Sequence, residues 1–274
     1  MSLVVGALLA LLALSSTIGA GLELELSHMR ARELWRPLAA ALLANLLVVP
    51  LASLWLLRSV SLPASSFAGL ALVALAPGGA SAPLLARLAG GEPTRVGVVY
   101  ISLCTGCLAT LGVLAPLVLP TQGGGLRVLL IMLVLQLLPL LLGLMVRSRR
   151  AALAERWAAG LRRAGSLLLA LVVIVLLITR GSFLFTMGIT TLVSTLVLVL
   201  VTLLAGALTV SPRLPDALLA CVRNLTLALM IAEAQEPGGA ATLVVAAYGL
   251  VMYVVASLCL LAHKRVRRGA QEYP

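Results

Sequence analysis

The sequence predicts an all-α polytopic membrane protein with about nine transmembrane helices. Of its 274 residues, 62% are hydrophobic and only 11% are charged, and the mean hydropathy is +1.16. A soluble domain contains about half apolar and a quarter charged residues, so lipid is the expected solvent. The apolar runs are continuous and do not alternate in polarity, which favours helices over the strands of a β-barrel.

Nine apolar runs approach the length that a bilayer requires. Segments rich in Gly, Pro and polar residues separate them, such as "GGEPTR" and "PTQGGG". The first run lacks a preceding basic segment, so we interpret it as a permanent helix and not as a signal peptide. No long linker divides the chain, so residues 1–274 are expected to form a single transmembrane domain. The expected spans are 2–22, 37–57, 64–90, 94–120, 126–146, 163–180, 183–208, 214–234 and 240–262.

Basic residues gather in alternate loops. One set of loops holds most of them, including segment 147–163 and the tail 263–274, whereas the opposite set holds only Arg58, Arg127 and Arg180. Under the positive-inside rule this pattern places the N-terminus outside and the C-terminus in the cytoplasm, in the cytoplasmic (inner) membrane of a bacterial cell. Segment 147–163 is predicted to be a short amphipathic surface helix that contacts lipid.

The net charge of +11 does not indicate a nucleic-acid partner, because no aromatic residues alternate with the basic ones to stack on bases. Cys104 and Cys107 form a C-x-x-C pair inside an apolar run, without a second pair or a nearby histidine. We interpret them as packing residues and expect no metal site. No H-E-x-x-H, nucleophile elbow or P-loop is present, so neither an enzyme nor a cofactor is expected.

The third span is interrupted at its middle by Pro77, Gly78 and Gly79, and Pro83 follows. Proline removes a backbone donor and clashes with the preceding turn, and paired glycines ease unwinding. A simple kink is the alternative, but this combination favours an unwound segment. Unwound backbone at membrane depth is tolerated only where it is buried in protein or lines a cavity.

The eighth span carries Arg223, Asn224 and Thr226 near its middle. A charged side chain that faces lipid costs about 3 kcal/mol or more, so Arg223 is expected to point inward. The acidic residues all lie near span ends or in loops, which leaves carbonyl groups, polar side chains or an external anion to balance the charge. One broken span in each half indicates an inverted-repeat transporter fold with a site near the midplane, with repeat one at 1–122 and repeat two at 123–268.

At these residues the sequence resembles a known family. "ALAPGGASAPLLARLAGG", followed by "VRNLTLALMIA", is similar to the bile acid:sodium symporter family, including its SBF-like bacterial branch. "IGAGLEL" and "ANLLVVP", which contains Asn45, also fit. The resemblance covers nearly the whole chain, in the form of the nine-helix members. It implies a core domain with two crossing unwound helices, a panel domain, and a rocking or elevator-like motion.

The sequence departs from the family at the positions that bind sodium. Apolar residues or a fixed cation replace the oxygen ligands that a hard cation prefers, so no sodium site is expected. The replaced positions are Ala82, Pro83, Leu219 and Arg223, together with Val96 and Tyr100, or Tyr100 and Cys104, depending on register.

We therefore expect a secondary transporter of a small organic anion that is not coupled to sodium and is either proton-linked or facilitative. The guanidinium of Arg223 replaces the bound cation, and it either also holds the substrate or only binds unwound carbonyls. The alternative is a receptor or partner subunit that keeps the fold without transporting; the oligomeric state stays open. The expected substrate or ion site comprises Asn45, Pro77, Gly78, Gly79, Ser81, Tyr100, Cys104, Arg223, Asn224 and Thr226, with Thr105, Tyr248 and Tyr253 as further polar candidates.

Overall fold

The computed structural model describes residues 2–24, 31–119, 130, 132–180, 187–208, 213–236 and 239–272. Every regular element among these residues is a helix. Five helical segments within them are long and apolar enough to cross a bilayer: Trp35–Arg58, Pro93–Val118, Gly188–Ala207, Leu214–Gln235 and Ala240–Arg265. The chain is therefore an all-α membrane protein, as the composition predicts.

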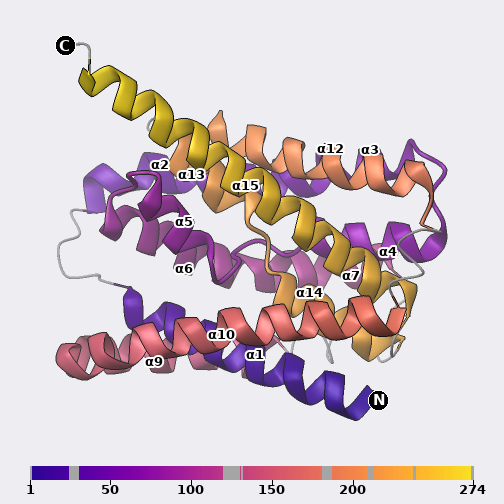
Figure 1. Ribbon diagram of the computed structural model, residues 1–274, viewed down its shortest axis with the longest axis horizontal. Helices are drawn as coiled ribbons and strands as arrows, with labels where there is room; N and C mark the ends of the chain where they lie inside the picture. Colours follow the sequence, from indigo (N-terminus) through magenta and orange to yellow (C-terminus); the bar gives the residue numbers. More distant parts are fainter. Residues whose placement is uncertain are drawn as a thin grey trace.

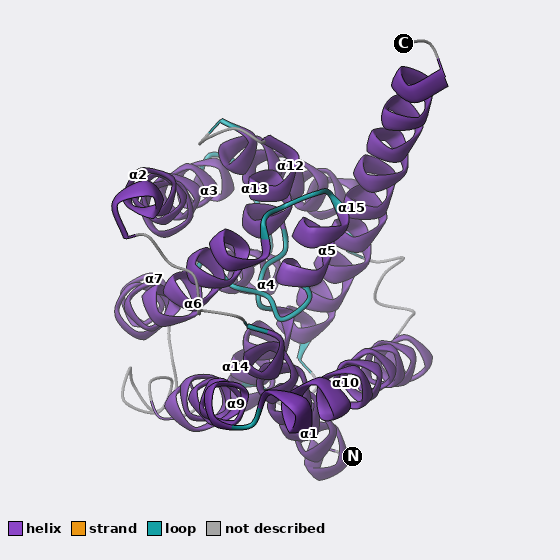
Figure 2. Cartoon of the chain, turned by 90° about the vertical axis from the view of Figure 1, so that its left-hand side faces the viewer, coloured by secondary structure: helices purple, strands orange, loops and turns teal. Residues whose placement is uncertain are grey.

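The helices form two layers (Figures 1 and 2). In the first, which we call the panel layer, α1 packs along α9 and α10. An ion pair between Glu23 on α1 and Arg162 on α10 joins two of these helices. The panel layer comprises α1 (Ser2–Glu23), η3 (Leu133–Leu137), α9 (Leu138–Arg149) and α10 (Ala151–Arg180).

The remaining helices form the second layer, which we call the core layer. Its centre is the end of α4, because every residue from Leu70 to Ala76 is fully buried. The layer meets the panel mainly where α14 packs on α1. Its elements are α2 (Ala31–Leu43), η1 (Ala44–Val48), α3 (Val49–Arg58), α4 (Ala64–Ala74), α5 (Ala82–Leu88), α6 (Pro93–Ala109), η2 (Thr110–Leu114), α7 (Ala115–Val118), α12 (Gly188–Ala207), α13 (Arg213–Cys221), α14 (Leu225–Gln235) and α15 (Ala240–Glu272).

One predicted element is wrong. Segment 147–163 is not a separate surface helix, because α9 ends at Arg149 and α10 runs without interruption from Ala151 to Arg180. The chain turns at Arg150, between α9 and α10, and segment 151–180 contains no proline that would end α10 early. The basic segment is thus the first part of a 30-residue helix.

Three wide π-helical turns interrupt the apolar helices, and each ends two residues before a proline. A proline ring clashes with the carbonyl four residues earlier in a regular α-helix, and a π-turn gives that carbonyl more room. Each turn contains one buried polar residue. The pairs are η1 with Pro50 and Asn45, η2 with Pro116 and Thr110, and η3 with Pro139 and Gln136.

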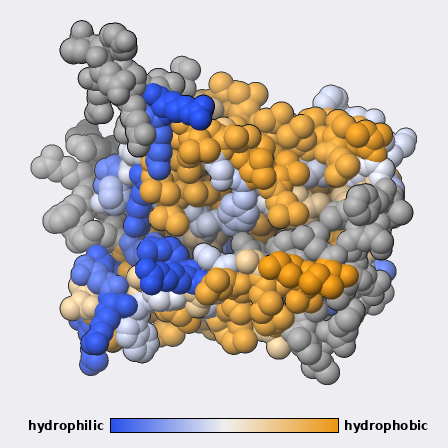
Figure 3. Space-filling model, viewed as in Figure 1, coloured by the Kyte–Doolittle hydropathy of each residue, from blue (hydrophilic) through white to orange (hydrophobic). Residues whose placement is uncertain are grey.

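Apolar side chains cover most of the face seen in Figure 3, and hydrophilic ones gather at the end where α10 begins and α15 ends. Exposed basic residues at this end are Arg149, Arg150, Arg156, Arg163, Lys264 and Arg265. This division matches an apolar belt for lipid with a basic end, which is the pattern expected of a membrane-integral protein.

Candidate functional site

The chain leaves the helical conformation at both predicted positions, and the two breaks touch each other. Residues 75–81 separate α4 from α5, and residues 222–224 separate α13 from α14. The amide N–H of Gly79 donates to the carbonyl of Val222 at 3.1 Å, and that of Asn224 donates to the carbonyl of Ala76 at 2.8 Å. These reciprocal bonds define a crossover, by which we mean residues 75–81 and 222–224.

Close backbone contact at the crossover explains the predicted glycines. A Cβ atom on Gly79 would lie 2.8 Å from the carbonyl oxygen of Val222 and still closer to that of Arg223. Gly78 has a φ of +80°, a conformation that side chains other than glycine rarely adopt. Pro77, which has no backbone N–H, stands at the start of this turn.

The guanidinium of Arg223 lies inside the crossover and not in lipid, since only 1% of the residue is exposed. Its Nε donates to the carbonyl of Val73 at 3.2 Å, and its Nη2 donates to that of Ala74. Its Nη1 donates to Oδ1 of Asn45 at 3.1 Å and to the carbonyl of Ala220 at 3.5 Å. The cation is therefore held by the ends of both broken helices.

The last carbonyls of α4 make this a suitable place for a cation. The end of a helix leaves carbonyl groups without partners and carries partial negative charge. Beyond the two carbonyls bound by Arg223, that of Leu75 accepts from Oγ1 of Thr110 at 2.7 Å and that of Ala76 accepts from the amide of Asn224. These bonds offset the cost of several kcal/mol for burying a charge.

Two π-turns supply side chains to this arrangement. Asn45 on η1 donates from Nδ2 to the carbonyl of Ala41 at 2.9 Å, which directs its oxygen to Arg223. Thr110 on η2 binds the end of α4, as described above. Gln136 on η3 lies near Cys104 and is 4% exposed, yet neither of its amide atoms has a hydrogen-bond partner among the described residues.

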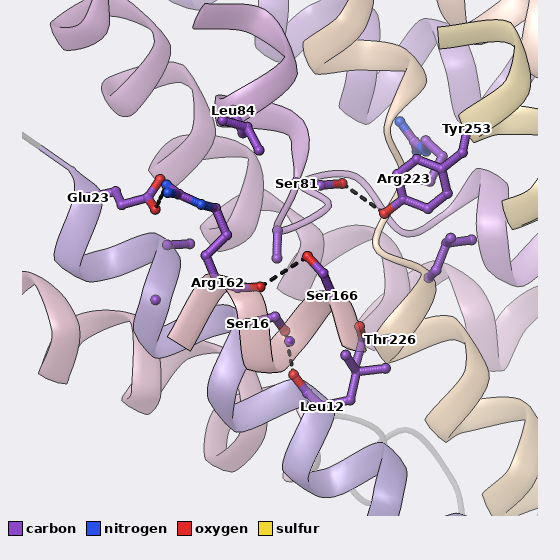
Figure 4. A pocket seen from close by; sticks show the side chains of 15 residues that line it. Leu12, Ser16, Glu23, Ser81, Leu84, Arg162, Ser166, Arg223, Thr226 and Tyr253 are labelled. Atoms are coloured by element: carbon purple, nitrogen blue, oxygen red, sulfur yellow. Dashed lines mark hydrogen bonds and ion pairs between the residues drawn. The ribbon is translucent and has the colours of Figure 1, made fainter. Parts of the chain in front are cut away.

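A cavity of about 90 Å³ lies between the two layers, beside the crossover (Figure 4). This volume holds several water molecules. The core layer contributes Ser81, Thr226 and Tyr253, together with the crossover residue Arg223. The panel layer contributes Ser16, Glu23, Arg162 and Ser166.

The predicted polar residues fall into three groups: those that line the cavity, those that support the crossover, and those that lie outside the cavity lining. Ser81 and Thr226 line the cavity, and so does Tyr253, whose hydroxyl lies 2.8 Å from Oγ of Ser81. Asn45 and Asn224 instead support the crossover, since Oδ1 of Asn224 accepts from the amide of Leu227 at 3.1 Å and caps α14.

Tyr100 and Cys104 do not line the cavity. They are buried in a small cluster with Ala20, Leu24 and Leu140, although the thiol of Cys104 donates to the carbonyl of Gly78 at 3.6 Å. Thr105 is exposed and binds the carbonyl of Ile101 on its own helix. Tyr248 is fully buried and is not part of the cavity lining.

The whole panel side of the cavity was missing from the sequence prediction. In the sequence, the panel side is indicated by two hydroxyl residues within apolar helices, Ser16 and Ser166. Glu23 and Arg162 were assigned to a span end and to a surface helix. In the structure Nη1 of Arg162 pairs with Oε1 of Glu23, and Arg87 on α5 donates to the carbonyl of Glu23 at 2.9 Å.

Within the described part of the chain, no group of three or more His, Cys, Asp or Glu residues could hold a metal ion. Compared with protein-family models and with curated proteins, the sequence matches none of them.

Proposed function

We propose that the chain is a secondary transporter of a small organic anion, similar in plan to the bile acid:sodium symporters but not coupled to sodium. The single observation that carries this proposal is a buried guanidinium at the crossing of two discontinuous helices, beside a cavity between two helical layers. Discontinuous helices that meet near a cavity are the usual site of substrate and ion binding in inverted-repeat transporters.

The contacts of Arg223 support its role as a replacement for a bound cation. A hard cation would need several oxygen ligands, and the carbonyl oxygens of Val73 and Ala74 are already bound by guanidinium donors. Arginine stays charged in proteins, so the crossover needs no dissolved ion. Because its donors are directed at backbone and at Asn45, we favour this role over direct contact with the substrate.

The cavity has features that suit an anion. Thr226, in the first turn of α14, lines it, and the N-terminus of a helix carries partial positive charge. Arg162 adds a cation on the panel side. The hydroxyls of Ser16, Ser81 and Ser166 line the same cavity and can donate hydrogen bonds to oxygen atoms of a substrate.

In this proposal nine helical segments cross the membrane, and each broken pair of helices counts as one crossing. The N-terminus is outside and the C-terminus lies in the cytoplasm, as the basic loops predict. Displacement of the core layer against the panel layer would open the cavity to each side in turn. The oligomeric state has no part in the proposal.

Uptake into proteoliposomes tests the proposal. Purified protein is reconstituted, and uptake of radiolabelled carboxylates is measured against protein-free vesicles in sodium-free buffer. Saturable uptake is the expected result. Saturable binding by the protein without accumulation in the vesicles would instead favour the alternative, a receptor that keeps the fold.

A further inference from the structure

The ion pair of Glu23 and Arg162 stands in the cavity wall, where α1 and α10 meet (Figure 4). The side chain of Arg162 is 42% exposed and that of Glu23 is 13% exposed, so the pair lies where the cavity opens to the surface. An ion pair with this exposure contributes little to stability, typically up to about 1 kcal/mol. The contribution of this ion pair to stability therefore explains its presence in the cavity wall only weakly.

The two arginines that border the cavity differ in what they can bind. The Nε, Nη1 and Nη2 atoms of Arg223 all donate to carbonyls or to Asn45. The guanidinium of Arg162 has a single partner among the described residues, one carboxylate oxygen of Glu23. A guanidinium has five donors and binds carboxylates through two parallel bonds. Arg162 can therefore bind a second carboxylate or exchange Glu23 for another one.

We propose that Arg162 binds the carboxylate of the transported anion, and that Glu23 occupies this position when the substrate is absent. This inference rests on the proposed function and specifies its substrate as a carboxylate, because a carboxylate is the group that Arg162 binds at rest. When the substrate takes Arg162, the carboxylate of Glu23 loses its cation.

No other cation in the described residues replaces Arg162 at the carboxylate of Glu23. Arg87 on α5 contacts Glu23 only at the backbone oxygen, and Tyr100 on α6 lies nearby. On α9, Arg147 pairs with Glu155 of α10 at 3.3 Å. The further charged side chains on helices that pack against α1 are Arg149 on α9, Arg156 and Arg163 on α10, and Glu233 on α14. Glu23 is therefore left without a cation among the described residues when Arg162 turns to the substrate.

Thermal-shift binding with matched ligands tests the exchange. Propionate, lactate and benzoate are titrated against the corresponding amides at pH 7.5, on the purified wild type and on R162Q, E23Q and R163Q. Arg163 is the matched control, because it is an exposed neighbour outside the cavity lining. The carboxylate that shifts the melting temperature of the wild type most, relative to its amide, is the probe for the variants.

The exchange predicts a distinct result for each variant. Wild type and R163Q bind the carboxylate alike. E23Q binds it several-fold more tightly than the wild type does, because the competing carboxylate is gone. R162Q loses about tenfold or more in affinity, as expected for a lost charge-assisted bond.

The outcomes separate this inference from the proposed function. If no carboxylate stabilises the wild type more than its amide does, both are overturned. If the wild type binds a carboxylate but E23Q binds it no more tightly, or R162Q binds as well as R163Q, only the exchange is overturned. The result for E23Q decides the matter even where R162Q fails to fold.

Discussion

Arg223 carries a permanent charge in a segment where removal of a cation from water costs several kcal/mol. The structure offsets this cost with carbonyls at the end of a broken helix, those of Val73 and Ala74, and with the amide oxygen of Asn45. The sequence alone shows that the charge must face inward. It does not show which oxygens bind it, because these lie about 150 and 178 residues away along the chain.

Replacing Arg223 should expose the need for a cation at the crossover. R223M removes one donor from each of four acceptors, the carbonyls of Val73, Ala74 and Ala220 and Oδ1 of Asn45. An acceptor left without any donor costs about 1–3 kcal/mol, so the melting temperature of R223M should fall in any salt. R223Q restores a side-chain oxygen beside the free carbonyls, a set that suits a hard cation. Its melting temperature should therefore be higher in sodium chloride than in choline chloride.

Differential scanning fluorimetry in the two salts measures both effects, with the wild type as the control. The wild type should show the same melting temperature in sodium and in choline. An R223M variant as stable as the wild type would contradict the role given to the guanidinium.

A methyl group on Gly79 should separate the two breaks. The added Cβ would meet the carbonyl oxygens of Val222 and Arg223, and both belong to backbone that cannot move freely. G79A should therefore lose about 1–3 kcal/mol of stability, the usual cost of overpacking. On α10, Gly160 has no atom within 4 Å of a built Cβ, so G160A is the matched control and should be neutral or slightly stabilising. Equal melting temperatures for the two variants would contradict the close contact.

At the scale of elements, the positions of prolines explain the breaks in the helices better than hydrophobic periodicity does. Pro77 with Gly78 and Gly79 predicts the break after α4, and the structure has it. Proline alone does not tell a kink from a π-turn, which is why the turns before Pro50, Pro116 and Pro139 went unpredicted. The surface helix predicted at 147–163 was wrong because no residue in segment 151–180 ends a helix, so α10 continues to Arg180.

The start of α6 depends on one carboxylate. Glu92 is its N-cap and accepts from the amides of Thr94 at 2.8 Å and Arg95 at 2.6 Å. Its slight burial raises the pKa of Glu92, but the bonds from Arg95 and Thr94 outweigh this effect and hold the pKa below its ordinary value. The charged form therefore stabilises the fold above the unfolded pKa, and this contribution is lost as the pH falls through the lowered folded pKa.

E92A should accordingly cost about 0.5–2 kcal/mol at pH 7, the usual range for a lost N-cap. The difference in melting temperature between E92A and the wild type should shrink in acid, where the wild-type carboxylate is protonated. A difference that stays constant down to pH 3, measured by scanning fluorimetry, would show that the carboxylate does not act as a charged cap.

At the scale of the whole molecule, the sequence predicts the core side of the cavity better than the panel side. Ser81 and Thr226 stand beside recognisable breaks, and both line the cavity. Arg162 and Glu23 stand in basic or terminal segments, and only the packing of α1 on α10 joins them across 139 residues. Neither the residue types nor their sequence neighbours indicate a cavity, so no pattern in the sequence could have paired Arg162 with Glu23.

Whether the crossover needs a dissolved cation is the central question for the whole molecule. The measurement that answers it most directly is the initial rate of carboxylate uptake into proteoliposomes, with external sodium, potassium or choline at equal ionic strength. A guanidinium that permanently fills the cation position predicts the same rate in all three salts. Uptake that occurs only in sodium would contradict the account.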